Sequence, residues 1–400
     1  MKRLVTFLFA MAVTSFLLVG ARWGYAEEVR GVTDDTVKIG LLADQTGLAA
    51  SVTVPMTEAA RVYFRYINDG GGINGRKIVT IVEDDHYSIP GAISAFKKLI
   101  FKDEVFAILF NGGLGQTLAL ERQIKKLKVP VMPLTIADKL TTPLRKYVFT
   151  MSASYDDGLK IIIDYIMRDL KAKNPRISHV YPDIEFGKSG VETVEKYLPK
   201  YNLKLVSKEV VPVPAIDATS QVLRSIRTNP DYIIFNSAAA GCIAFLKGAK
   251  KYGLKSKIIG GFYVSTEDII SSSGDSAKDI LAVSPFCYWY DDSPGMVELR
   301  KITTKYQPQT KPKTRSYTQG WIISMIWAEG LKRAGRNLTP DTLVQALETF
   351  DKFSTGGIST PVSYSSTNHK GGRGFKLYKT DMERETYVPI TDYRDPAFED

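Results

Sequence analysis

A glycine-rich segment, Asn111–Thr117, has the residue types and spacing best suited to ligand binding in this sequence. Gly112, Gly113 and Gly115 follow an apolar run and lead directly into a segment of helical periodicity. Glycine lets the backbone approach a bound group closely, and free N–H groups at the start of a helix favour an anion. The segment therefore predicts a contact with a small carboxylate. A plain turn between a strand and a helix would use the same glycines, so both interpretations stay open.

The glycine-rich segment is not a nucleotide-binding motif, because it lacks the Gly-x-Gly-x-x-Gly spacing and no Gly-Lys-Ser/Thr follows it. A Gly-x-Ser-x-Gly elbow and a His-Glu-x-x-His pair are also absent from the sequence. Glu83, Asp84, Asp85 and His86 form a candidate metal cluster, but neighbouring side chains on an extended segment point in alternating directions. Solvated loop charges are the favoured interpretation. We therefore expect a protein that is not an enzyme and that needs neither a cofactor nor a metal.

The composition is typical of a soluble globular chain with two domains. Its 400 residues exceed what one compact core usually contains. A content of 44% hydrophobic and 24% charged residues excludes a disordered chain and a multi-pass membrane protein. The formal net charge of +10 suggests nucleic acid, a membrane surface or an anionic ligand as the partner. No nucleic-acid-binding module appears, so we expect no nucleic-acid partner.

The first 26 residues have the layout of a secretory signal peptide. Lys2 and Arg3 precede an apolar run, 4–20, and small residues flank Tyr25 before a predicted cleavage after Ala26. A membrane anchor is the alternative, but the run is shorter than the about 20 apolar residues that a spanning helix needs. Cleavage places the mature protein in the periplasm and lowers its formal charge to +7.

The rest of the chain alternates between short apolar runs rich in β-branched residues and segments of helical periodicity. The predicted strands are 37–43, 77–82, 106–110, 130–134, 177–181, 203–210, 232–235, 257–260 and 280–284. Helices are predicted between them and, after the last strand, at 294–306, 317–333 and 339–350. This alternation predicts two α/β units with parallel sheets. Ligands bind beyond the carboxyl ends of such strands. In the first unit those loops are 44–55, 84–90, 111–115 and 135–138.

Several of these segments together resemble a known family. Val37–Leu42 with Gln45–Gly47, the run Ile67–Arg76, the acidic Glu83–Asp85 and the pair Phe186-Gly187 carry the resemblance. They are similar to the type I periplasmic solute-binding proteins of ABC importers, in the branch that binds leucine, isoleucine and valine. The similarity extends from about Val37 to Tyr378.

The resemblance implies two Rossmann-like lobes with parallel sheets, joined by a three-segment hinge. It implies an N-terminal lobe of 27–150 plus 286–359 and a C-terminal lobe of 151–285 plus 360–400. It further implies a receptor that closes its hinge on a small carboxylate-bearing solute, an amino acid or an aromatic or aliphatic acid. Nothing in the sequence requires a dimer, so we expect a monomer. The receptor would deliver the solute to a membrane permease. A ligand-sensing protein that works with a membrane sensor or regulator is the alternative.

The resemblance also implies a set of site residues, at which this chain departs from its relatives. The serine and threonine that hold the carboxylate correspond to Leu114 and about Ala137, and the acidic residue that holds the ammonium corresponds to Phe262. Glu267 or Asp268 are substitutes for that acid, although a helix start explains them equally well. A carboxylate without an ammonium therefore rivals leucine or valine. The predicted ligand-binding residues are Val52, Gly113, Leu114, Gly115, Thr135, Ile136, Ala137, Phe186, Ala238, Phe262, Tyr263 and Tyr317.

The disulfide of the family's first lobe is absent from this chain. Its two cysteine positions correspond to Tyr87 and Gly113, so both halves are replaced together. The remaining cysteines, Cys242 and Cys287, are too few for a zinc cage or a disulfide framework. Because the resemblance assigns them to a lobe and to a hinge segment, we expect two separate buried thiols.

Overall fold

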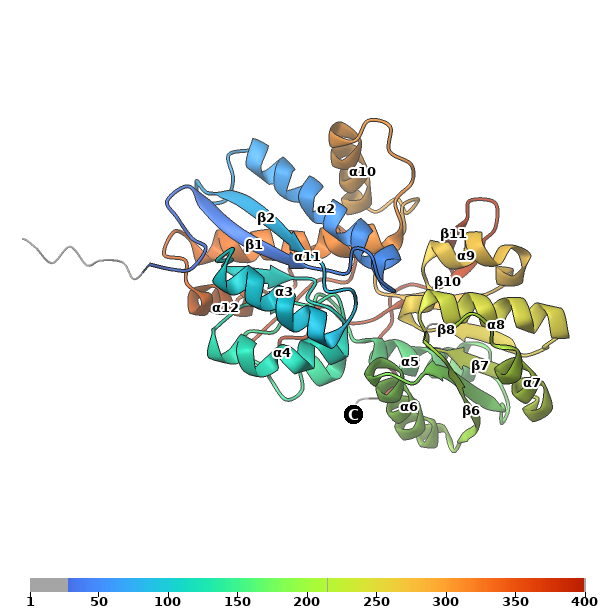
Figure 1. Cartoon of the computed structure of the whole chain (residues 1–400). Helices are drawn as coiled ribbons and strands as arrows, with labels where there is room; N and C mark the ends of the chain where they lie inside the picture. The colour runs from blue at the N-terminus through green and yellow to red at the C-terminus, as the bar shows by residue number, and fades with distance from the viewer. Residues whose placement is uncertain (1–27, 214, 399–400) are drawn as a thin grey trace, which may run out of the picture.

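The computed structural model describes residues 28–213 and 215–398, which form two α/β lobes side by side (Figure 1). One lobe is built around a sheet of four strands and the other around a sheet of seven. The predicted signal peptide lies outside the described residues. Within them, none of the helices has the length and the apolar character needed to cross a membrane.

The first lobe contains a fully parallel sheet with the strand order β2-β1-β3-β4. Its strands are β1 (Thr36–Leu42), β2 (Lys77–Glu83), β3 (Ala107–Leu109) and β4 (Val131–Met132). The helices between them are α2 (Ala50–Asp69), α3 (Ile89–Phe101) and α4 (Leu114–Lys126). The strands consist mainly of apolar β-branched residues and leucine because helices cover both faces of the sheet, and residues such as Ile39 and Leu41 are fully buried.

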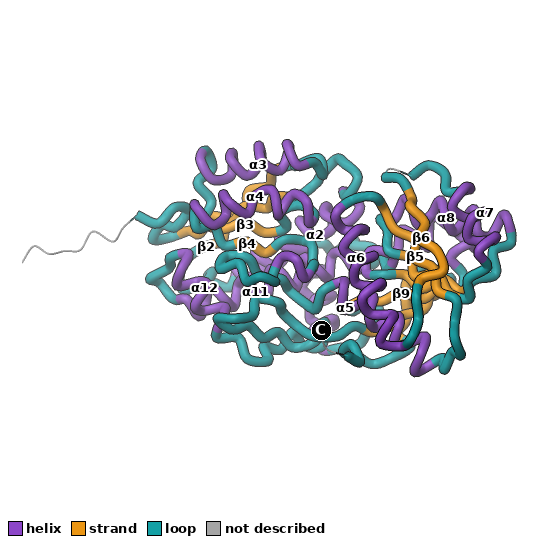
Figure 2. The backbone as a smooth tube through the Cα atoms, turned by 90° about the horizontal axis from the view of Figure 1, so that it is seen from below, coloured by secondary structure: helices purple, strands orange, loops and turns teal. Residues whose placement is uncertain are grey.

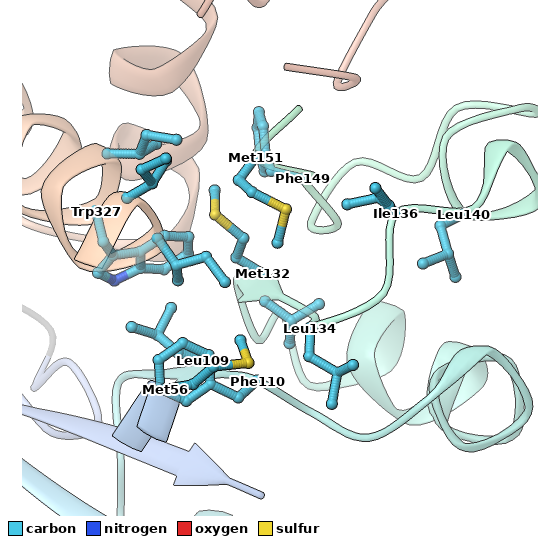
Figure 3. Close-up of a cluster of buried hydrophobic side chains, with 14 of the residues drawn as sticks. Met56, Leu109, Phe110, Met132, Leu134, Ile136, Leu140, Phe149, Met151 and Trp327 are labelled. Carbon is cyan, nitrogen blue, oxygen red and sulfur yellow. The ribbon is translucent and has the colours of Figure 1, made fainter. Parts of the chain in front are cut away.

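Three helices from later in the sequence complete the first lobe. They are α10 (Pro294–Tyr306), α11 (Arg315–Ala334) and α12 (Pro340–Glu348). The helices α10 and α11 pack against α2, and α12 packs against α11. Figure 3 shows the resulting core, in which Met56 of α2, Met132 of β4 and Trp327 of α11 converge with Phe149 and Met151.

The second lobe has the strand order β11-β10-β9-β8-β7-β5-β6. The parallel strands are β5 (Ile177–Pro182), β6 (Leu205–Val211), β7 (Tyr232–Phe235), β8 (Lys257–Gly260) and β9 (Leu281–Ser284). Two antiparallel strands, β10 (Lys376–Asp381) and β11 (Thr386–Pro389), extend the sheet at one edge. The predicted fold of two lobes with parallel sheets is therefore confirmed, with an antiparallel addition that the sequence pattern did not indicate.

The helices of the second lobe lie on both sides of its strands (Figure 2). They are α5 (Tyr155–Asp164), α6 (Glu185–Tyr197), α7 (Thr219–Thr228), α8 (Ala239–Tyr252) and α9 (Glu267–Ser273). Cys242 of α8 and Cys287 beyond β9 are separate buried thiols, as expected. Burial raises the pKa of the Cys287 thiol to about 12.

The chain passes between the two lobes three times, after β4, after β9 and after α12. In the third passage, the Tyr364 hydroxyl donates to the Thr150 carbonyl at 2.8 Å and His369 stacks on Phe149. The ammonium of Lys370 then bridges Asp138 and Asp157 at 3.0 and 2.9 Å. The lobe boundaries expected from the sequence stay a prediction.

Close packing of α11 against α2 gives a test of the first-lobe core. A methyl group at Gly320 of α11 would overlap the Met56 backbone of α2. We expect Gly320→Ala to lower the free energy of unfolding by about 1–3 kcal/mol, because a packed interface has no room for the added carbon. Chemical denaturation measures the change. Gly115→Ala, on a helix where the new methyl group would make only an ordinary contact with Ile89 Cδ1 at 3.8 Å, is the matched control and should not destabilise the protein. Equal loss in both variants would contradict the packing argument.

Candidate ligand-binding cleft

A cavity of about 270 Å³ lies between the two lobes, beyond the carboxyl ends of their parallel strands. The first lobe contributes residues that follow β1, β2 and β4, namely Leu48, Ala49, Ser51, Val52, Tyr87 and Leu134. The second lobe contributes the loops that follow β5, β6, β7 and β8. In each lobe the strand order reverses beside the first strand of the series, and such reversals are where open α/β sheets bind ligands.

The structure brings part of the predicted site into the cavity wall. Four of the predicted residues line the cavity: Val52, Phe186, Ala238 and Tyr263. The remaining predicted residues lie outside the wall: Gly113, Leu114, Gly115, Thr135, Ile136, Ala137, Phe262 and Tyr317. Tyr317, for example, is buried between helices of the first lobe, where its hydroxyl bonds to Thr303 at 2.9 Å.

The glycine-rich turn before α4 is covered by a tyrosine. A Cβ atom at Gly113 would lie 2.8 Å from the hydroxyl oxygen of Tyr87 and 2.9 Å from Oε1 of Gln116. Because Gly113 has no side chain, the Tyr87 ring has room to lie against it. Tyr87 and Gly113 are the two positions at which the family's disulfide cysteines are replaced in this chain. Burial raises the pKa of the Tyr87 phenol to about 12, so the hydroxyl stays neutral. Tyr87, and not the glycines, lies in the cavity wall.

Three carboxylates shape the first-lobe loops around the cavity. Oxygens of Asp44, Asp84 and Asp85 lie within 4.8 Å of one another. The carboxylate of Asp44 accepts from the Gly47 and Ala49 N–H groups at 2.5 and 2.7 Å, and thereby fixes the turn that leads into α2. The sequence interpretation of Asp84 and Asp85 missed this cluster because Asp44 comes from the neighbouring strand.

Asp85 is the member of this cluster whose charged form is made unfavourable by burial. Its Oδ1 accepts from the Tyr87 N–H at 2.9 Å, whereas its buried Oδ2 has no hydrogen-bond partner among the described residues. Burial raises the pKa of Asp85 to about 6, and the charges of Asp44 and Asp84 act in the same direction. The carboxyl group is therefore more easily protonated in the folded protein than in the unfolded chain.

An aromatic cluster forms the second-lobe side of the cleft. The ring of Phe186 meets those of Tyr155 and Tyr263 edge to face, with centroids 4.9 and 5.3 Å apart. Phe262, the position where the family's acidic residue was expected, is fully buried behind Tyr263. The guanidinium carbon of Arg315 lies 4.1 Å from the centroid of the Phe262 ring. Phe262 therefore packs against a buried cation and does not line the cavity.

Arg315 also joins the lobes through its backbone. It is the first residue of α11 in the first lobe, and its N–H donates to Glu267 of α9 in the second lobe at 2.9 and 3.1 Å. Burial raises the pKa of Glu267 to about 7, against the opposing effect of this hydrogen bond and of the Arg315 charge. The carboxylate that the sequence offered as an ammonium partner is thus engaged at the start of a helix. Asp268, the other substitute, remains in the cavity wall.

A second ion pair connects the lobes at the edge of the cleft. The ammonium of Lys139, just beyond the first-lobe strand β4, lies 2.9 Å from Glu185 and 3.5 Å from Glu192 of α6. These groups are partly exposed, so each pair is worth about 0–1 kcal/mol. Together with the Arg315 contacts, they hold the two lobes against each other beside the cavity.

Sequence reasoning missed several residues of the wall. Tyr87 follows β2 in a loop that the strand-end rule had selected, so its position in the sequence was a usable signal. Ser237 and Thr266 belong to loops of the second lobe, whereas Asp268, which the sequence had offered as a substitute acid, is the second residue of α9. The same rule, applied to the strands β7 and β8, would have selected those loops as well.

Comparison with known proteins agrees with this arrangement. The sequence matches a family model described as periplasmic binding protein over residues 36–385. It is 22% identical over 327 residues to "Leu/Ile/Val-binding protein homolog 7" of Brucella abortus (strain 2308), covering 79% of this chain and 81% of that protein. It is 23% identical over 352 residues to "Leu/Ile/Val-binding protein homolog 8" of Brucella suis biovar 1, covering 84% and 86%.

Solved structures of similar fold cover almost the whole described chain. A branched chain amino acid ABC transporter protein from Thermus thermophilus with bound valine has a TM-score of 0.83 at 23% identity, covering 92% of this chain and 98% of that one. A fatty acid ABC transporter substrate-binding protein from Thermomonospora curvata has a TM-score of 0.81 at 21% identity, covering 94% and 95%. These similarities show the fold.

The buried carboxyl group of Asp85 predicts a pH-dependent cost. Because its folded pKa is raised, the charged form destabilises the protein as the pH rises through about 4 to 6 and remains unfavourable above that range. We expect Asp85→Asn to raise the free energy of unfolding at pH 8 by about 1 kcal/mol and to change it little at pH 4. Urea unfolding at the two pH values measures this difference. An Asp85→Asn variant that loses stability equally at both would contradict the assignment.

Proposed function

Because the chain belongs to the periplasmic binding protein family, we propose that it is the exported solute receptor of an ABC importer. The cavity between the lobes is the observation that carries this proposal, since both lobes supply its walls and only their approach encloses it. The family match over 36–385 and the fold of the similar structures support the same role. The predicted signal peptide supports a location in the periplasm.

The walls of the cavity suit a small and mainly apolar solute. Apolar side chains such as Val52, Leu134, Ile184, Phe186 and Ile243 come from both lobes. A volume of about 270 Å³ is near the lower end of the range for small-molecule sites. The proposed solute is a small carboxylate-bearing molecule, either an amino acid or an aromatic or aliphatic acid. Similar proteins carry names that mention valine and fatty acid, which supports this choice.

Hinge closure is the proposed mechanism of capture. A solute in this cavity contacts both lobes only when they approach, so its binding free energy favours the closed arrangement. The three chain passages would act as the hinge, and the lobes 27–150 plus 286–359 and 151–285 plus 360–400 would move as units. The closed form would then dock on a membrane permease and release the solute.

A thermal-shift assay on the mature protein tests the proposed function. The panel contains branched-chain and aromatic amino acids, the corresponding carboxylic acids and amides, and dicarboxylates. A solute at 100 times its dissociation constant stabilises the folded state by about 2.7 kcal/mol, which raises the melting temperature by several degrees.

Ala238→Trp, which fills the cavity from its wall, should abolish that shift. Val297→Trp, half exposed on α10, is the control and should leave it unchanged. The proposal fails if no member of the panel raises the melting temperature, or if Ala238→Trp retains the full shift.

Closure should also depend on pH through Glu267. Opening of the lobes would expose this carboxyl group to solvent and return its pKa toward the ordinary value near 4.5, whereas burial in the closed form raises that pKa to about 7. Closure is then accompanied by protonation of Glu267 at pH values between about 4.5 and 7. The affinity for the solute should therefore fall as the pH rises from 5 to 7, by at most about fortyfold from this group, and then level off.

Glu267→Gln should flatten this dependence, as measured by isothermal titration calorimetry at constant ionic strength. Glu298→Gln, an exposed position on α10, should keep the wild-type profile. An unchanged pH profile in the Glu267→Gln variant would contradict the role of this contact.

A further inference from the structure

We propose that the polar head group of the solute binds on the second lobe, at Ser237, the start of α8 and Asp268, and not at the glycine-rich turn of the first lobe. This inference rests on the proposed receptor function and changes the class of its ligand: it excludes the plain carboxylic acids and admits a primary amide beside an amino acid. The head group must combine a hydrogen-bond acceptor with a donor and must carry no net negative charge.

The start of α8 supplies a set of donors in the cavity wall. Ala239, Ala240 and Gly241 form its first turn and line the cavity, and no side chain caps the helix. Their N–H groups have no partner within the helix, because a helix leaves its first amides unpaired. Such amides, together with the helix dipole, attract an acceptor oxygen.

Ser237 gives independent support for a ligand at this place. Its side chain is 1% exposed, and its Oγ has no hydrogen-bond partner among the described residues. A Cβ at Gly241 would lie 2.7 Å from this Oγ, which places the hydroxyl beside the first turn of α8. Because an unpaired buried hydroxyl is costly, an acceptor on the solute would satisfy a group that the protein leaves open.

Asp268 requires a hydrogen-bond donor on the solute, in addition to the acceptor that Ser237 requires. It is the only charged residue among the described residues of the cavity wall, and its Oδ1 is buried without a hydrogen-bond partner among them. A buried carboxylate oxygen needs a donor. The solute must therefore present an N–H group near its acceptor oxygen.

The first-lobe groups that the resemblance implied for the head group are not available in the cavity wall. Tyr87 covers the glycine turn before α4, and Leu114 occupies the expected serine position and is buried. The nearby cation, Arg315, is fully buried and lies over the Phe262 ring outside the wall. A bare carboxylate in the cavity would thus face Asp268 without a compensating cation, and like charges at close range are unfavourable.

Two head groups share the required chemistry. In an α-amino acid, the carboxylate would accept from Ser237 and the amides of α8, while the ammonium would donate to Asp268. In a primary amide, the carbonyl and the amino group would take the same two places. The apolar remainder would then contact Val52, Phe186 and Tyr263, which line the rest of the cavity.

Matched series of probes test this assignment. One series consists of leucine, 4-methylpentanamide and 4-methylpentanoate, and the other of phenylalanine, 3-phenylpropanamide and 3-phenylpropanoate. Calorimetry should show that the amino acid or the amide of the better series binds at least about tenfold more tightly than its acid. Equal or tighter binding of the acid would overturn the head-group site and leave the proposed function intact. Absence of binding by all six probes would overturn both.

Two variants locate the site on the second lobe. Asp268→Asn should shift the ratio of affinities about tenfold toward the acid, because it removes the opposing charge and keeps the shape. Ser237→Ala should lower the affinity for the preferred probe about fivefold, because it removes the hydroxyl group as a hydrogen-bond donor. Ser272→Ala, exposed on α9, is the control and should change neither value. An unchanged ratio in Asp268→Asn, in a variant whose melting temperature shows that it is folded, would refute the assignment.

Discussion

A guanidinium group buried between the two lobes determines how they meet. Arg315 begins α11 in the first lobe and is fully buried, a position that is unfavourable for a cation without compensation. The second lobe supplies part of that compensation through the Phe262 ring at 4.1 Å and the nearby Glu267 carboxylate, which accepts from the Arg315 backbone N–H, while two guanidinium nitrogens have no hydrogen-bond partner among the described residues. Phe262 and Glu267 therefore both contact Arg315 at the boundary between the lobes. The chemistry left for a solute is that of the neighbouring wall, where Asp268 and Ser237 have unsatisfied polar atoms.

The same constraint explains the role of the late helices. Arg315 reaches the cleft because α11 returns to pack against α2, although more than two hundred residues separate these helices in the sequence. The lobes are therefore assembled from separate stretches of chain, and the passages between them lie near the cleft. A change at the boundary of the lobes acts directly on the cavity between them, which is the physical basis of the proposed capture by closure.

The positive charge of the chain is a property of its surface and not of its cleft. Lysines such as Lys125 and Lys126 are exposed in the last turn of α4, where they complement the helix dipole. Lys250 of α8 is likewise exposed and pairs with Asp275 at 3.2 Å. No lysine or arginine belongs to the described wall of the cavity. The net charge thus gives little information about the solute, and the apolar walls with their few polar atoms give more.

The sequence by itself determined the alternation of strands and helices and the family, because hydrophobic periodicity and the run Ile67–Arg76 are local features. It also located the loops at the strand ends, including the one that carries Tyr87. Only the tertiary structure decided which side chains of those loops reach the cavity. Gly113 is covered by Tyr87 and Phe262 packs against Arg315, whereas Asp268 lies in the wall. The direction of a loop side chain depends on what packs against it, and those partners come from distant parts of the chain.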